Sequence, residues 1–111
     1  MDPSVENNLT TLRSLCAENE VQAMYVFGSA TTGKRTPRSD FNFLVRFRDI
    51  PFDRYTENYF RLHYAIEALL GAPIDLLTEP SIKNPIFKAE VDKTKTEIYP
   101  NIDLNVQLKL L

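Results

Sequence analysis

The chain has 111 residues, of which 43% are hydrophobic and 25% are charged, a size and composition that suit one globular domain with one core. Its formal net charge of −2 excludes a global attraction to nucleic acid or to an anionic membrane, so any basic site must be local. A single cysteine excludes an internal disulfide and argues against a zinc site built from cysteines.

Residues 1–111 contain no linker, repeat or low-complexity segment, and we expect them to form a single domain. No apolar run approaches the roughly 18 residues of a membrane span, and the polar N-terminus is unlike a signal peptide. Together with the lone cysteine, these features favour a cytoplasmic protein without a membrane partner.

The first expected element is a helix from residue 2 to about residue 19. Asp2 offers a capping side chain, and Pro3 suits the first helical position. Apolar residues then recur at helical spacing on one face: Val5, Leu9, Leu12 and Cys16. We expect Cys16, at the end of this face, to be a core residue and not a nucleophile.

Two strands and an intervening loop follow. Residues 21–27 are β-branched and aromatic, which predicts a strand that stops at Gly28. Ser29 is a good helix cap and favours a short helix within the loop over residues 28–38. The second strand is expected over residues 40–48. Its side chains alternate, so that Asp40, Asn42 and Leu44 share one face while Phe41, Phe43 and Val45 face the core.

The second half predicts a long helix, a strand, a helix and a short strand. Asp53 is a candidate cap for the long helix, and Gly71 marks its end. Residues 74–78 form the third expected strand, Asn84 caps the next helix, and residues 98–99 form a short strand. The buried stripe of the long helix comprises Tyr55, Tyr59, Leu62, Ile66 and Leu69. This order predicts an α/β (α+β) domain with a small mixed sheet and helices packed mainly on one face.

The last eleven residues, 101–111, have a different pattern. Five apolar residues alternate with polar ones: Ile102, Leu104, Val106, Leu108 and Leu110. A period of two predicts an amphipathic terminal strand. Such a strand would pack on its own sheet or pair with another chain.

The turn at Gly28 and Ser29 is a candidate phosphate site. A glycine lets the backbone approach a ligand closely, and a helix start at Ser29 would direct N–H groups at an anion. Lys34, with Arg35 and Arg38, adds positive charge on the following loop, where a triphosphate could be neutralised.

Candidate metal ligands lie on the two following strands. Asp40 and Ser39, the latter a candidate nucleotide contact, open the second strand, and Asp75 lies on the third. Asp75 stands between Ile74 and Leu76 on a strand expected to be buried, where a carboxylate needs a partner or a metal. A carboxylate beside phosphate makes chemical sense when a cation lies between them, and Mg²⁺ prefers oxygen ligands. Two such ions held by carboxylates would stabilise an in-line phosphoryl or nucleotidyl transfer.

The spaced pattern of Gly28-Ser29, Gly33, Ser39-Asp40-Phe41-Asn42 and Asp75 resembles the minimal nucleotidyltransferases of the polymerase-β superfamily, over roughly residues 9–100. The resemblance implies transfer of a nucleoside monophosphate from a nucleoside triphosphate to a hydroxyl group, with Mg²⁺. It implies nucleotide contacts at Gly28 and Ser29 and metal ligands at Asp40, Asn42 and Asp75. It also implies a helical partner protein, with some members acting as antitoxins.

Asn42 departs from the family pattern, which has a second aspartate there. A neutral amide oxygen should weaken Mg²⁺ binding, because this ion gives up water reluctantly. Two hypotheses follow: a nucleotidyltransferase whose activity is weakened or lost, or an inactive module that binds a helical partner or forms homo-oligomers.

Plainer interpretations stay open for several of these residues. Gly28 could be an ordinary turn glycine, and Asp40 could accept hydrogen bonds from its own loop. Asp103 repeats the Ile-Asp-Leu context of Asp75 but is expected on a solvated strand face. His63, the only histidine, is expected to be a partly covered helix residue.

Overall fold

The structure, a computed structural model, describes residues 1–36 and 40–100. Within these residues one four-stranded sheet has the order β3-β2-β1-β4. The strands are β1 (Val21–Phe27), β2 (Phe41–Phe47), β3 (Ile74–Thr78) and β4 (Thr96–Tyr99). The helices are α1 (Pro3–Glu6), α2 (Leu9–Glu18), α3 (Ser29–Thr32), α4 (Phe52–Leu70), α5 (Pro85–Thr94) and the 3₁₀ helix η1 (Glu79–Ser81).

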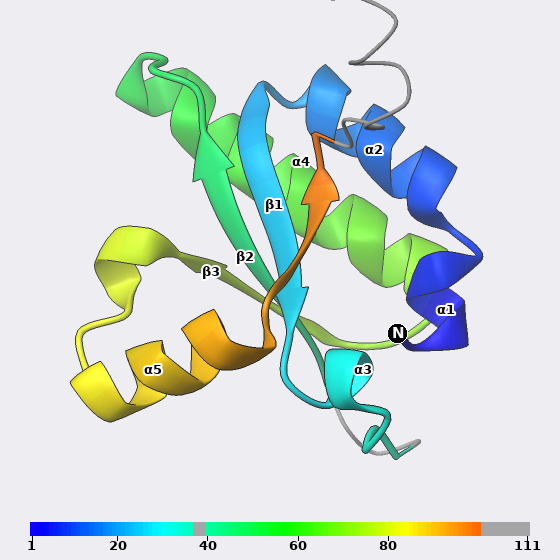
Figure 1. The fold of residues 1–111 in the computed structure, drawn as a ribbon. Coiled ribbons are helices and arrows are strands. Elements are labelled where there is room, and N and C mark those ends of the chain that lie inside the picture. Colours follow the sequence, from blue (N-terminus) through cyan, green and yellow to red (C-terminus); the bar gives the residue numbers. More distant parts are fainter. Residues whose placement is uncertain (37–39, 101–111) are drawn as a thin grey trace, which may run out of the picture.

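The sheet is mixed. β1 pairs antiparallel with both β2 and β4, whereas β2 and β3 run parallel. Parallel neighbours cannot be joined by a tight hairpin, and the long helix α4 makes the crossover between them (Figure 1). The predicted α/β domain with a small mixed sheet is therefore confirmed.

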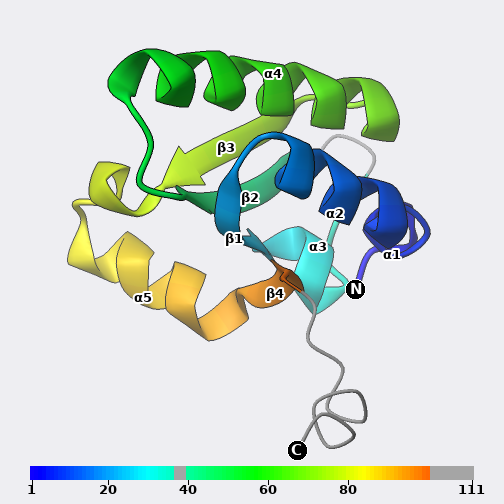
Figure 2. The same cartoon turned by 90° about the horizontal axis from the view of Figure 1, so that it is seen from above.

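Helices cover the two faces of the sheet unequally. α2 and α4 lie over one face, and α5 lies over the other (Figure 2). The expectation that helices pack mainly on one face is met by α2 and α4, which close the main core. Among the described helices, α5 is the one that lies over the opposite face, and the described elements leave part of that face for a site.

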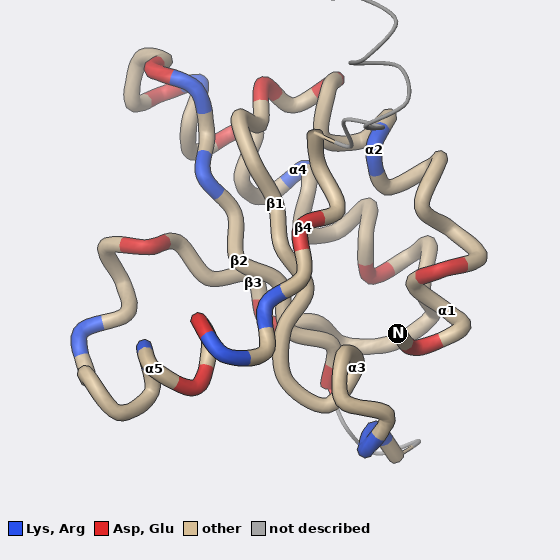
Figure 3. Tube along the Cα trace, viewed as in Figure 1, with Lys and Arg blue, Asp and Glu red and all other residues tan. Residues whose placement is uncertain are grey.

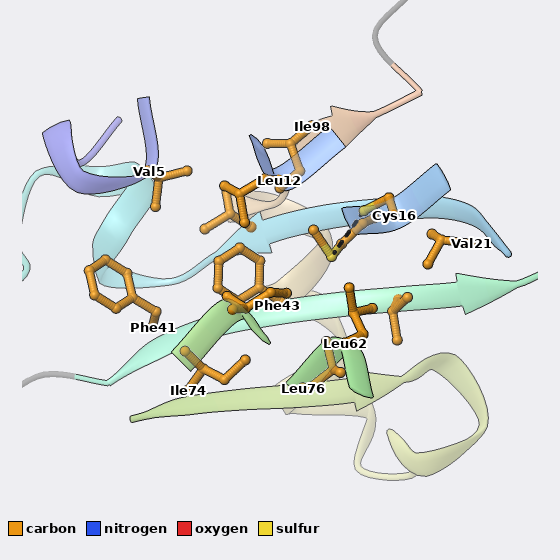
Figure 4. Close-up of a cluster of buried hydrophobic side chains, with 14 of the residues drawn as sticks. Val5, Leu12, Cys16, Val21, Phe41, Phe43, Leu62, Ile74, Leu76 and Ile98 are labelled. Carbon is orange, nitrogen blue, oxygen red and sulfur yellow. Dashed lines mark hydrogen bonds between the residues drawn. The ribbon is translucent and has the colours of Figure 1, made fainter. Parts of the chain in front are cut away.

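The main core lies between the first face of the sheet and helices α2 and α4 (Figure 4). Phe41, Phe43 and Val45 of β2 point into it, as their alternation predicted. Each such side chain contributes about 1.5–3 kcal/mol when it is buried. Cys16 belongs to the same core, with its Sγ 3.8 Å from Met24 Sδ. Burial raises the pKa of this thiol to about 12, which fits a core residue.

The single N-terminal helix that the spacing predicted is interrupted. α1 ends at Glu6 and α2 begins at Leu9, although the Asp2 cap is present, with its carboxylate accepting from the Ser4 N–H at 2.8 Å. At the break the Asn8 side chain donates to the Ser4 carbonyl at 2.7 Å. Asparagine side chains compete in this way with the backbone, and apolar periodicity does not reveal such competition.

Most other boundaries agree with the sequence. β1 and β3 match the predicted ranges 21–27 and 74–78, and β2 is one residue shorter at each end than predicted. The N-cap of α4 is Pro51, so the expectation that Asp53 caps this helix is wrong. Asp53 lies in the first turn, where its negative charge interacts favourably with the helix dipole. Among the described residues, no helix is long and apolar enough to cross a membrane. The terminal strand expected over 101–111 lies outside the described residues.

Candidate functional site

The turn between β1 and α3 has a backbone that favours glycine. Gly28 has φ of 77° and ψ of −144°, and a Cβ built there would lie 3.1 Å from Nδ2 of Asn42. Its carbonyl accepts from the Thr31 N–H at 3.0 Å and from the Thr31 hydroxyl at 2.8 Å. Ser29, half-buried, is the first residue of α3. The absence of a side chain at position 28 therefore lets Asn42 lie directly against the turn.

Asn42 and Asp75 are direct neighbours across the sheet. In the strand register, Phe27 is the partner of Asn42, and Asn42 is the partner of Asp75. Partners on adjacent strands project to the same face, with backbones about 4.8 Å apart. Phe27, Asn42 and Asp75 thus form one row across β1, β2 and β3, which we call the polar row. It begins beside the Gly28 turn.

The next row identifies the face. Tyr25 is the partner of Leu44, and Leu44 is the partner of Leu77. Leu44 packs with Phe27 and with Val91 of α5 in a second, smaller core. The polar row therefore lies on the α5 side of the sheet, at the margin of that small core and on the face opposite the main core.

Asp40 and Asp75 are both exposed. Asp40 comes directly before β2, two residues ahead of Asn42, in the alternation that assigns both to one face. Asp75 was predicted on a buried strand, where a carboxylate would require a partner. That reason is wrong, because its neighbours Ile74 and Leu76 are buried in the main core while Asp75 points to the other face.

The donor set at the polar row suits a cation only in part. Among residues 1–36 and 40–100, no three or more His, Cys, Asp or Glu side chains form a group that could hold a metal ion. Asp40 and Asp75 supply carboxylates, and Asn42 supplies one neutral oxygen. Oxygen ligands of this kind fit Mg²⁺, but a bound nucleotide would have to complete the coordination with its phosphate oxygens.

The basic residues after α3 are not equivalent. Lys34 is exposed, in the basic segment that follows α3 in Figure 3. The Arg35 guanidinium lies 3.7 Å from the centre of the Phe41 ring and 3.8 Å from the Asp2 carboxylate. Arg35 therefore ties the loop to the N-terminus, and its role towards phosphate stays a prediction. Arg38 and Ser39 lie outside the described residues.

Thr94, the last residue of α5, is a site residue that the sequence did not indicate. The Gly28 N–H donates to Thr94 Oγ1 at 3.0 Å, and the Thr94 hydroxyl donates to the Glu90 carbonyl at 3.0 Å. Thr94 follows the buried Val91 by three positions, a helical spacing that offered a signal for a residue facing the sheet. The C-terminal end of α5 is thereby fixed to the turn.

The rival residues lie elsewhere. His63 Nε2 is 3.5 Å from the Glu67 carboxylate on α4, which covers the opposite face of the sheet. Tyr59 packs on the main core and donates its hydroxyl to the Leu76 carbonyl at 2.6 Å. Burial raises the pKa of the Tyr59 phenol, with smaller contributions from Tyr55 and Asp75. Asp103 lies outside the described residues.

The sequence pattern of the family described as "Polymerase beta, Nucleotidyltransferase" matches residues 10–103 of this chain. The chain belongs to this nucleotidyltransferase family. The matched span contains the Gly28 turn, the polar row and Thr94. The resemblance seen in the sequence is thus confirmed at the level of the family.

Relatives of this family member have more specific names. A protein of Methanocaldococcus jannaschii that is named as a protein adenylyltransferase is 32% identical over 74 residues, covering 67% of this chain and 73% of that protein. The protein adenylyltransferase MntA of Thermococcus cleftensis is 37% identical over 68 residues, covering 61% of this chain and 66% of that protein.

Solved structures share the fold. A chain described as a minimal nucleotidyltransferase matches with a TM-score of 0.70 and 28% identity, covering 86% of this chain and 95% of that one. A toxin–antitoxin structure with AMP-PNP matches with a TM-score of 0.62 and 19% identity, covering 91% of this chain and 79% of that one. At that identity the second match concerns the fold alone.

Proposed function

We propose that this chain is a nucleotidyltransferase that transfers a nucleoside monophosphate, AMP in the first instance, from a nucleoside triphosphate to a hydroxyl group of a protein. The observation that carries the proposal is the polar row beside the Gly28 turn, inside a family-matched domain. The adenylyl group and the protein acceptor are suggested by the names of the relatives.

In this proposal, the turn at Gly28 and Ser29 binds the triphosphate, and Lys34 adds positive charge. Asp40, Asn42 and Asp75 would hold one or two Mg²⁺ ions, which when bound would neutralise the phosphate charge that develops during transfer. The acceptor oxygen forms a bond to the α-phosphorus as the bond to the bridging oxygen breaks and diphosphate leaves. The hydroxyl proton passes to the Asp75 carboxylate, which is exposed.

Binding is the first test, because the proposal requires it whatever the rate of transfer. Calorimetry with ATP should give heat of binding in the presence of Mg²⁺ and none in the presence of a chelator. Asp40→Ala should abolish this binding. Asp49→Ala is a matched control, because Asp49 is exposed at the opposite end of β2. Absence of binding to the unaltered protein at millimolar ATP would rule out the proposed function.

Asn42 favours a second candidate function, a module that has lost efficient catalysis and acts through a partner. A neutral ligand in place of a charged one leaves fewer charges for the ions. Toxin–antitoxin structures share the fold, which supports a helical partner protein and an antitoxin-like role. ATP binding without label transfer from α-phosphate-labelled ATP to a co-purified partner would favour this candidate.

Two further parts of the proposal concern the setting. The alternating residues 102–110 support pairing between two copies of the chain, which would be a homodimer. The free, buried thiol of Cys16 supports a reducing, cytoplasmic setting.

A further inference from the structure

α5 presents exposed apolar side chains on the face of the sheet that holds the polar row. Val91 faces the sheet and is buried, while Phe87, one turn earlier, is 43% exposed and Ile86 is 76% exposed. The small core under the helix already consists of Phe27, Leu44 and Val91. An aromatic ring with this much exposure, one turn from a buried anchor, is available to a ligand.

The Phe87 ring lies next to the candidate site. It meets the Phe27 ring edge to face, with 6.1 Å between the ring centres and 70° between the planes. Phe27 is the residue before Gly28 and the strand partner of Asn42. The exposed ring therefore contacts one member of the polar row directly, and that member adjoins the turn.

The backbone of Phe87 is held at both ends of its helix. The side-chain oxygen Oδ1 of Asn84 accepts from the Ile86 N–H at 2.8 Å and from the Phe87 N–H at 3.2 Å. At the other end, Thr94 Oγ1 accepts from the Gly28 N–H. A ring presented by a helix that is fixed to the turn needs little reorganisation when a ligand binds, and this lowers the cost of binding.

We propose that Phe87 is the stacking platform for the base of the nucleoside triphosphate whose phosphates bind at the Gly28 turn. This inference rests on the proposed function and extends it to the other end of the substrate. Every base has a π-face, so stacking on phenylalanine tolerates any of them. The chain should therefore discriminate weakly between bases and bind purines, with their larger rings, more tightly than pyrimidines.

Calorimetry with two probes, ATP and inorganic tripolyphosphate, both with Mg²⁺, separates the platform from the phosphate site. Phe87→Ala should weaken ATP binding about tenfold, as expected for the loss of one base–aromatic stack, and should leave tripolyphosphate binding unchanged. Phe87→Tyr should retain ATP binding. Ile86→Ala is the control, since it removes a neighbouring exposed apolar side chain without removing a ring.

Three results would overturn the platform. They are an unchanged ATP affinity in Phe87→Ala, an equal loss of affinity for ATP and tripolyphosphate, or the same loss in Ile86→Ala. In each of these cases the unaltered protein still binds ATP, so the proposed function stands. If the unaltered protein binds neither probe, the proposed function fails and the platform fails with it. Melting temperatures measured alongside will show whether each variant is folded.

Discussion

Asn42 is the residue on which the proposed activity depends most. Its side chain lies against Gly28 and next to Asp75 on the neighbouring strand. An amide there tolerates the absence of a metal ion, whereas an aspartate would place a second carboxylate beside Asp75. In the proposed site, Asn42 should therefore lower the affinity for Mg²⁺ and avoid repulsion between neighbouring carboxylates when no ion is bound.

Asn42→Asp should lower the stability of the protein without Mg²⁺ and raise its affinity for Mg²⁺ and ATP. Without Mg²⁺, like charges directly opposite each other on adjacent strands should lower the melting temperature. With Mg²⁺, the melting temperature should recover, and ATP should bind about tenfold more tightly because the site gains a charged ligand. Thermal unfolding with and without Mg²⁺, together with calorimetry, measures both effects.

The double variant Asn42→Asp, Asp75→Asn is the matched control, because it moves the charge without adding one. It should show neither the loss of stability nor the tighter binding. If Asn42→Asp alone changes neither quantity, the pocket does not bind Mg²⁺ through this row.

Glu20 gives a prediction about pH at the corner where α2 meets β1. Its carboxylate accepts from the side chain of Arg54 and from Asn58 Nδ2 at 2.8 Å. The hydrogen bond from Arg54, and to a smaller extent the one from Asn58, lowers the pKa of Glu20 below its ordinary value of 4.5. A lowered pKa stabilises the fold at pH values above 4.5, and this contribution disappears as the pH falls through the folded-state value.

Glu20→Gln should therefore lower the melting temperature at pH 7, and the difference from the unaltered protein should vanish in acid. Glu57→Gln is the control, because Glu57 forms an exposed ion pair with Arg61 within α4 and such pairs contribute little. Circular dichroism melts between pH 7 and pH 3 give the comparison. A difference that persists unchanged into acid would contradict the assignment.

At the scale of elements, local sequence patterns predicted the bounds of two strands and the core-facing side chains of a third. The runs over 21–27 and 74–78 were predicted with their full bounds, because β-branched and aromatic residues are bounded there by glycine and proline. Alternation also predicted which side chains of β2 enter the core. The break at Asn8 was missed because a side chain that competes for backbone hydrogen bonds leaves no trace in apolar spacing.

Contacts between distant elements were harder to predict, and they define the candidate site. The neighbourhood of Asn42 and Asp75 depends on strand order and register, which the spacing within each strand does not specify. The exposure of Asp75 depends on the same order, so it was misjudged. The bond between Gly28 and Thr94 joins residues 66 positions apart, and without the fold Thr94 is an ordinary helix end.

Thr94→Val tests the link between α5 and the turn. Valine fills a similar volume but leaves the Gly28 N–H without its acceptor, which should cost about 1 kcal/mol of unfolding free energy and weaken ATP binding. Thr94→Ser keeps the hydroxyl and should bind ATP like the unaltered protein. Denaturant unfolding and calorimetry measure the two effects.

Thr10→Val, on the exposed side of α2, is the control for replacing a helical threonine. It should change neither stability nor ATP binding by a comparable amount. If Thr94→Val and Thr94→Ser bind ATP equally well, the hydrogen bond to Gly28 does not position the turn for the nucleotide.

At the scale of the whole molecule, the two faces of the sheet have separate tasks. The face under α2 and α4 holds the main core (Figures 2 and 4). The face under α5 holds the polar row and the small core. Lysine and arginine are interspersed with acidic residues along the described trace (Figure 3), in keeping with the small formal net charge of −2. Among the described strands, β3 and β4 are the edges of the sheet.

The exposed edges of the sheet are candidate pairing sites for the segment that follows β4. The family match ends at residue 103, so the remaining alternating residues, 104–110, lie beyond the matched span. An extended segment with one apolar face gains stability by adding to an exposed edge, either of its own sheet or of a second copy. Pairing with a second copy would make the oligomeric state depend on this segment.

Truncation after Asn101 should therefore convert a dimer into a monomer, while ATP binding at the Gly28 turn should persist in each chain. Sedimentation of the full and truncated chains at equal concentration measures the change, and the melting temperature checks that the domain is folded. Lys109→Ala, which alters the polar side of the alternation, should leave the dimer intact. If the oligomeric state is the same after truncation, pairing does not use residues 102–111. If the melting temperature falls while the oligomeric state is unchanged, the segment packs on its own sheet.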